Sequence, residues 1–131
     1  MYHAATKLGE DKLLIFGGNA PLNKLADDNL YLLSTYPRIQ WEIVDIEGIG
    51  PGSRYGHAMW YDRPYFIVFG GNDQQKVLND CYVVNMERRP RRWTQLNFER
   101  APCPRYFHTV CVVINRRKEK YVMLGGLSEQ G

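Results

Sequence analysis

Short hydrophobic segments, separated by clusters of glycine, proline and polar residues, run along the whole chain. The segments are rich in β-branched and aromatic residues, a pattern typical of β-strands. The pattern predicts strands at 3–8, 13–17, 29–34, 41–46, 57–61, 65–70, 80–85, 93–98, 108–114 and 120–125. We therefore expect an all-β fold.

The segments follow an internal repeat. Three apolar segments end in a pair of glycines, and the first glycines of successive pairs are 53 and 55 residues apart. The pairs are Gly17 and Gly18, Gly70 and Gly71, and Gly125 and Gly126. A histidine begins the segment before each pair, at His3, His57 and His108. Self-similarity at such a period is the signature of a repeat architecture.

Large aromatic residues recur at equivalent places in the first two repeats. Tyr31 and Tyr82 follow the glycine pairs, and Trp41 and Trp93 follow the tyrosines. The second strand of each repeat is apolar on both faces, as 66–69 shows, so it needs a covering layer above and below. Sheets stacked face to face around an axis supply that cover. We expect both tryptophans to be buried between such sheets.

These features together resemble the kelch repeat, the blade unit of kelch β-propellers. The resemblance implies a kelch β-propeller fragment of about two and a half four-stranded antiparallel blades, within one partial domain at 1–131. Blade 1 is expected at 1–50, blade 2 at 51–101 and half of blade 3 at 102–131. Propellers generally need about four blades or more to close, so we expect a piece of a larger propeller.

The resemblance also defines the candidate functions. Kelch propellers imply a protein-interaction module, with a protein or the rest of the parent propeller as its partner. The segment 51–59 followed by 70–73 is similar to the kelch region of Bsu1-like and protist Ser/Thr phosphatases. This chain would then be the regulatory part, with the catalytic domain outside it. A galactose-oxidase-like enzyme is a further alternative, since Cys81 adjoins Tyr82.

We expect no catalysis, cofactor or metal in this chain. The three histidines occupy equivalent repeat positions, which a structural role predicts better than convergence on one ion. Cys81 and Tyr82 lie inside the repeated third-strand pattern, which favours packing. The phosphatase signatures GDxHG and GNHE are absent from the sequence. The odd count of three cysteines favours a reducing compartment, cytoplasmic or nuclear. No apolar stretch is long enough to span a membrane.

Charge is distributed unevenly about the expected blades, although the net charge is only +3. In an up-and-down blade, the first-to-second and third-to-fourth connections share one face. That face carries eleven basic and five acidic residues, and the opposite face carries five basic and eight acidic residues. The basic face suits an acidic protein surface, a phosphorylated peptide or anionic lipid. Nucleic acid is not expected, because the basic clusters lack interleaved aromatic residues.

Candidate binding residues come from the loops of the opposite face, because loops on a rigid scaffold carry recognition. The contact face is predicted from Asn19–Asp28, Asn72–Asn79, 47–56 and 99–107. The candidate binding residues are Arg54, Asn72, Asp73 and Arg105. Arg54 and Arg105 have an equally good alternative as buried structural salt bridges.

Incomplete blades predict self-association of the isolated chain. Two and a half blades expose a blade face at each end and leave an open strand edge near 120–125, including Tyr121, Val122, Met123 and Leu124. Open edges and large apolar patches are templates for association. We therefore expect a homo-oligomer.

Overall fold

The computed structural model describes residues 4–115 and 118–128, and the side chains of these except Asn23, 109–115 and 118–122. The first sheet contains β1 (Ala4–Lys7), β2 (Lys12–Phe16), β5 (Leu30–Ser34) and β6 (Gln40–Val44), and the second contains β7 (Ala58–Asp62), β8 (Tyr65–Asn72), β9 (Val77–Asn85) and β10 (Thr94–Leu96). A third sheet pairs β11 (Thr109–Asn115) with β12 (Lys118–Leu124).

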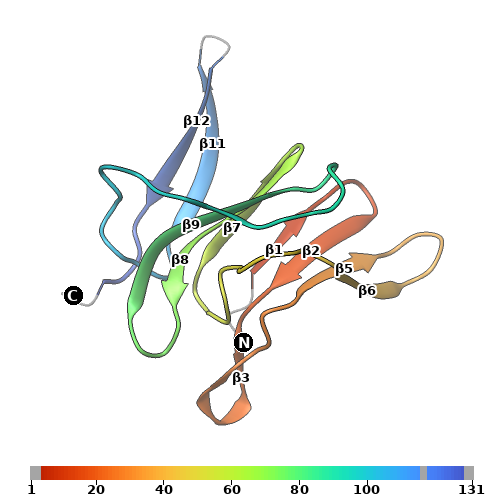
Figure 1. Ribbon diagram of the computed structural model, residues 1–131, viewed down its shortest axis with the longest axis horizontal. Coiled ribbons are helices and arrows are strands. Elements are labelled where there is room, and N and C mark those ends of the chain that lie inside the picture. Colours follow the sequence, from red (N-terminus) through yellow and green to blue (C-terminus); the bar gives the residue numbers. More distant parts are fainter. Residues whose placement is uncertain (1–3, 116–117, 129–131) are drawn as a thin grey trace.

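Each sheet is an antiparallel meander whose strand order follows the chain. The sheets succeed one another across the molecule, from red and orange through green to blue in Figure 1. Strand β7 contacts β1 on one side and β11 on the other, so the first strands of successive sheets lie innermost. The predicted all-β fold of four-stranded antiparallel blades is confirmed, and the described sheets do not close into a ring.

The connection between the second and third strands differs between the two complete sheets. In the first sheet it forms a small hairpin of β3 (Asn19–Ala20) and β4 (Lys24–Leu25) around the 3-10 turn η1 (Pro21–Asn23). In the second sheet, β8 and β9 stay paired as far as Asn72 and Val77, with a register shift between Phe69 and Gly71. Half of the long loop expected at 72–79 is therefore strand, and the turn itself is confined to 73–76.

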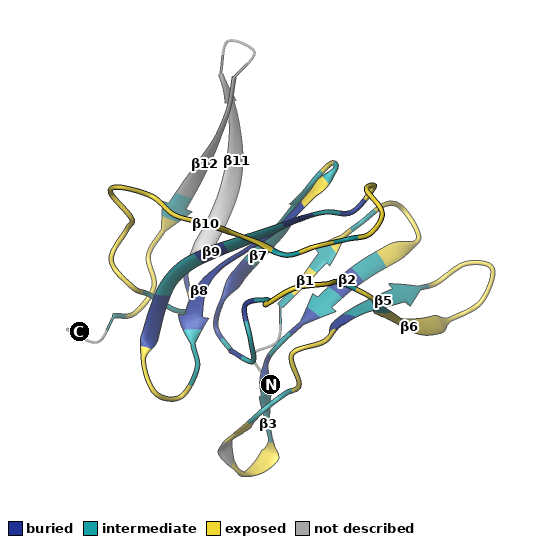
Figure 2. Ribbon diagram, viewed as in Figure 1, coloured by how far each residue is buried: buried dark blue, intermediate teal, exposed yellow. Residues whose placement is uncertain are grey.

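The main core lies between the first and second sheets, as the dark blue segments of Figure 2 show. Alternate residues of each strand face this core because side chains alternate across a strand. Its fully buried members are Leu14, Phe16 and Leu30 from the first sheet and Phe66, Val68 and Val84 from the second. Each such side chain contributes about 1.5–3 kcal/mol through burial.

A second core continues the same pattern beyond β8. Ile67 and Phe69 point to the opposite face of β8 and pack with Cys81 and the partly buried Met123 of β12. Strand β8 thus buries both of its faces, as its uninterrupted apolar sequence requires.

The glycine pairs mark close approaches between neighbouring blades. Gly17 and Gly70 both have positive φ, at 71° and 68°. A Cβ on Gly17 would lie 2.6 Å from Cε1 of His57, and a Cβ on Gly70 would lie 2.8 Å from Cε1 of His108. Each histidine also packs edge-on against the phenylalanine before that glycine, Phe16 or Phe69. Glycine and histidine therefore form one repeated contact between successive blades.

The expectation of two equivalently buried tryptophans is wrong for Trp41. Trp93 is half-buried among the rings of Phe16, Phe66 and Tyr82, where it bridges the first two sheets. Trp41 is 57% exposed. The reason is geometric, because a tryptophan at this position packs against the preceding sheet, and no sheet precedes the first one among the described residues.

Candidate functional site

The four candidate binding residues gather at one edge of the second sheet. Tyr55 pairs with Asn72 through two backbone hydrogen bonds of 3.0 and 2.9 Å, which places the segment before β7 beside the β8–β9 turn. The carbonyl of Arg105 accepts a bond from the Gly71 N–H, and the N–H of Arg105 donates to Leu78. The segments before β7 and β11 therefore flank the β8–β9 hairpin.

Arg54 lies in the interior, with only 2% of its surface exposed. Its guanidinium donates two bonds to the carboxylate of Asp80, at 2.6 and 3.0 Å, and further bonds to the carbonyls of Gly70 and Pro51. This bidentate geometry matches a buried, hydrogen-bonded ion pair, which is costly to break. The geometry favours the structural alternative for Arg54.

Arg105 repeats part of the Arg54 arrangement in the next blade. Its Nη1 donates to the carbonyl of Gly125 at 3.1 Å, as Arg54 does to Gly70, and its Nε donates to Cys103 at 3.2 Å. Within the described residues, no carboxylate takes the place that Asp80 has beside Arg54. Arg105 is half-buried, and the two carbonyl bonds use only some of the five N–H donors of its guanidinium, so a positive charge with remaining donors is held here.

Asn72 and Asp73 shape the turn between β8 and β9. The side-chain oxygen of Asn72 accepts the N–H of Gln74, and that of Asp73 accepts the N–H groups of Gln75 and Lys76. Partial burial raises the pKa of Asp73, but these N–H donors outweigh it and hold the pKa below its usual value. The turn thus presents an ionised carboxylate on a rigid backbone.

Three aromatic rings form a cluster beside these polar residues. Tyr55 lies 6.0 Å from Tyr106 and 6.1 Å from Phe107 between ring centres, and the last two lie 4.9 Å apart. Phe107 is 43% exposed and has a positive φ of 57°. The sequence analysis missed this cluster as a site. The signal was the recurrence of Arg54-Tyr55-Gly56-His57 as 105–108, in which Phe107 replaces the glycine.

We call the surface formed by the turn and the aromatic cluster the loop-edge surface. It comprises Tyr55, Asn72, Asp73, Arg105, Tyr106 and Phe107. It combines exposed aromatic carbon with one basic and one acidic group. Aromatic and arginine side chains of this kind supply most of the energy of protein–protein contacts.

The buried histidines and Cys81 have environments that suppress their reactivity. Burial, together with the charge of Arg54, lowers the pKa of His57 to about 3. Burial and the charge of Arg105 likewise lower the pKa of His108. Burial raises the pKa of the Cys81 thiol to about 11. Cys81 and Tyr82 face opposite sides of β9, so they do not form a linked pair.

The charge separation expected from the loops is weaker in the structure. Glu47 follows β6 and is among the acidic residues expected on the opposite face, whereas Arg92 lies in the β9–β10 connection of the basic face; in the structure Glu47 accepts a 3.1 Å bond from Arg92. Backbone bonds from Glu47 to Arg91 and from Trp93 to Glu47 fix this contact. The connection after β6 therefore runs beside the β9–β10 connection and neutralises part of its charge.

Repeated four-stranded antiparallel sheets, with glycine–histidine contacts between them, define a blade-repeat protein of the β-propeller class. The chain belongs to the KLHDC2/KLHL20/DRC7 Kelch-repeats domain family, whose model matches residues 2–131. The kelch resemblance drawn from the sequence is thereby confirmed. Kelch domains are non-catalytic interaction modules.

Several larger proteins contain a region similar to this chain. It is 31% identical over 122 residues to Adagio-like protein 3 of Oryza sativa subsp. japonica, covering 92% of the chain and 19% of that protein. It is 36% identical over 98 residues to serine/threonine-protein phosphatase BSL2 of Arabidopsis thaliana, covering 74% and 10%. A probable serine/threonine-protein kinase of Dictyostelium discoideum is 30% identical over 130 residues, covering 95% and 9%. The chain thus corresponds to a small part of each relative.

No helix among the described residues is both long and apolar enough to cross a membrane.

Proposed function

We propose that this kelch domain binds a partner protein through its loop-edge surface. The observation that carries the proposal is the aromatic cluster with its exposed Phe107 beside Arg105, whose guanidinium has no acidic partner within the described residues. A bound peptide carboxylate would complete on Arg105 the pairing that Asp80 makes with Arg54. The rings of Tyr106 and Phe107 would contact the adjacent apolar carbon.

The variety of the relatives supports binding as the shared role. The similar regions lie in proteins named as a phosphatase, a kinase and Adagio-like proteins. The activities that these names state differ, while the kelch region is common to all of the proteins. The shared region therefore supports a role in recognition rather than in catalysis.

Selection from a random peptide library displayed on phage tests this function. We expect enriched peptides that carry an acidic residue next to an apolar one. Phe107→Ala and Arg105→Ala should each weaken their binding by about tenfold, since single contact residues of this kind cost about 1–2 kcal/mol. Tyr36→Ala and Arg38→Ala remove exposed residues of the same types from the β5–β6 turn and should leave binding unchanged.

The outcomes separate clearly. Failure to enrich any peptide, or equal losses in the variants and their controls, would remove the loop-edge surface as the binding site. Circular dichroism of each variant verifies that the fold is intact.

The phosphatase similarity supports a second proposal, which concerns the parent protein. The identity of 36% to BSL2 supports a parent that joins this domain to a Ser/Thr phosphatase domain. The longer coding sequence tests it directly, because a phosphatase domain carries recognisable metal-binding motifs. If the longer coding sequence lacks a phosphatase domain, this second proposal fails, and the proposed role in protein binding is unaffected.

Two further proposals concern the assembly and the location of the protein. We infer that the isolated chain self-associates through its terminal blade faces, and that the protein is intracellular. Cys81 and Cys103 have unpaired thiols in the structure, which suits a reducing compartment.

A further inference from the structure

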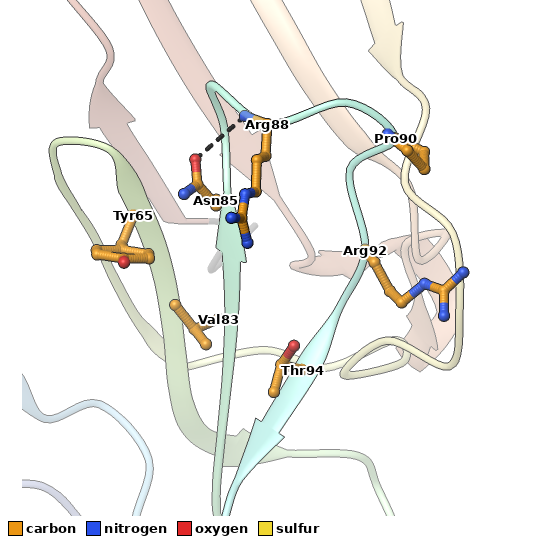
Figure 3. Close-up of a pocket in the computed structure, with 7 residues that line it drawn as sticks. All are labelled: Tyr65, Val83, Asn85, Arg88, Pro90, Arg92 and Thr94. Carbon is orange, nitrogen blue, oxygen red and sulfur yellow. Dashed lines mark hydrogen bonds between the residues drawn. The ribbon is translucent and has the colours of Figure 1, made fainter.

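The connection between β9 and β10 borders a hollow of about 400 Å³. The hollow lies at the end of the second sheet opposite the β8–β9 turn and the loop-edge surface. Its walls include Tyr65 at the start of β8, Val83 and Asn85 on β9, Thr94 on β10, and Arg88 and Arg92 from the connection (Figure 3). We call it the arginine hollow. None of the described residues that line it is acidic.

Arg88 supplies the charge of the arginine hollow. Its backbone N–H donates to Oδ1 of Asn85 at 3.2 Å, which folds the start of the connection over β9. In Figure 3 the Arg88 side chain extends back along β9, toward the space beside Val83, while Arg92 points away from it. No described side chain forms an ion pair with Arg88.

Two acidic residues next to arginines of this connection are already paired. Glu87 accepts a bond from Arg63, and Glu47 accepts one from Arg92. A second hollow on the other side of the connection differs in this respect, because its lining includes Glu42 and Asp45 as well as Arg89 and Arg91. Uncompensated positive charge therefore concentrates at Arg88 and favours an anionic occupant.

Strand β10 offers the occupant a backbone as well. It is the outer strand of its sheet, with β9 on one side and no strand on the other within the described residues. An extended segment can pair along such an edge and place alternate side chains on the face of the sheet that carries the hollow. Thr94 belongs both to this edge and to the arginine hollow, so the two features act on one ligand.

We propose that the arginine hollow binds a carboxylate side chain of an extended acidic segment of a protein partner. The carboxylate accepts hydrogen bonds from the Arg88 guanidinium and the Thr94 hydroxyl, and its carbon stem lies against Tyr65 and Val83. This inference rests on the proposed role in protein binding. It adds a second contact, at the end of the second sheet opposite the loop-edge surface.

Fluorescence anisotropy with a labelled hexaglutamate peptide and the 131-residue chain tests this site. Binding should saturate, weaken with added salt, and be absent for hexaglutamine. Arg88→Glu should weaken hexaglutamate binding by at least about tenfold, the loss expected for a charge-assisted bond. Arg38→Glu makes the same charge change outside the hollow and should weaken it less than about twofold, given screening beyond a Debye length.

The possible outcomes either support or overturn the site. Equal losses for Arg88→Glu and Arg38→Glu would show a diffuse field and overturn it, as would equal binding of hexaglutamine. Tighter binding of oligouridylate or of phosphatidylserine vesicles would replace the acidic segment with nucleic acid or membrane. The phage selection tests the loop-edge surface, and the contrast between Arg88→Glu and Arg38→Glu tests this site, so failure of one is distinguishable from failure of the other.

Discussion

At the scale of single residues, Gly70 is fixed by two separate requirements. Gly70 has a φ of 68°, and a Cβ there would lie 2.9 Å from the carbonyl oxygen of Arg105. Gly52 has a similar φ of 76°, but a Cβ there would meet no atom within 4 Å. The two positions therefore separate backbone strain from steric contact.

We predict that Gly70→Ala destabilises the chain more than Gly52→Ala. Both variants incur about 1–2 kcal/mol for the left-handed conformation, and only Gly70→Ala adds a clash with backbone atoms that cannot move aside. Urea unfolding of the two variants measures the difference. Equal free energies of unfolding would show that the close approach between blades at Gly70 adds no steric cost to the Gly70→Ala variant.

His57 makes stability depend on pH. Its folded pKa is about 3, against an ordinary value of 6.5, so the unfolded chain takes up a proton that the folded chain does not. The contribution of His57 to the free energy of unfolding is therefore fully present above pH 6.5. It falls as the pH is lowered toward 3, by about 1.4 kcal/mol per pH unit.

His57→Leu should reduce this slope between pH 6.5 and 5, above the range where most carboxylates titrate. The free energy of unfolding across that range measures it. An unchanged slope would mean that protonation of His57 is not coupled to folding.

At the scale of strands and sheets, Trp93, the residue just before β10, joins the second sheet to the first. Trp93 reaches Phe16 of the first sheet, with ring centres 6.4 Å apart. Gly50 allows this approach, since a Cβ there would lie 2.7 Å from Nε1 of Trp93. Trp41 has the equivalent position without a preceding sheet to contact.

Trp93→Ala should lower the free energy of unfolding by about 3 kcal/mol, the lower end for deleting an aromatic side chain, because Trp93 is half-buried. Trp41→Ala should cost less than about 1 kcal/mol, as expected of an exposed side chain. Chemical denaturation of both variants checks the contrast, which equal losses would contradict.

The sequence predicted the strands closely because each one carries a local signal. Apolar runs bounded by turn residues located β2 and β5 to within a residue, and the glycine pairs gave the order of the sheets. The extension of β9 back to Val77 had no such signal, since a backbone partner, rather than its own composition, makes it a strand. The exposure of Trp41 depends on a neighbouring sheet, which no local pattern encodes.

The candidate site was predictable only in part. Asn72, Asp73 and Arg105 were correctly expected to share one edge, because equivalent loops of a meander meet there. The sequence alone left open whether Arg54 pairs inside the protein, since that depends on its distance from Asp80. The aromatic cluster arises from contacts between two repeats, so it could be read only by superimposing them.

At the scale of the whole molecule, the first and second sheets both present apolar surface. The outer face of the first sheet includes Trp41 and Ile43, which are 57% and 61% exposed. The second sheet has a largely apolar hollow of about 380 Å³ beside β12, lined by Trp60, Phe69 and Met123 among others. Strand β12 pairs with β11 alone within the described residues, and the side chains of Tyr121 and Val122 lie outside them.

Self-association should follow from the exposed face of the first sheet. We predict oligomers at micromolar concentration by sedimentation equilibrium, with Ile43→Lys shifting the chain toward monomer because a buried lysine must be desolvated. Ile49→Lys is the control, since Ile49 is 91% exposed outside the sheets. A stable monomer at high concentration would contradict this prediction.

Recognition at the loop-edge surface is the central claim, and hydrogen–deuterium exchange with a phage-selected peptide tests it most directly. The peptide should slow exchange in the β8–β9 turn at 73–76 and in the segment 105–107, because binding restricts opening of the backbone it contacts. Protection confined to other segments, such as 40–44 on the outer strand of the first sheet, or no protection at saturating peptide, would contradict it.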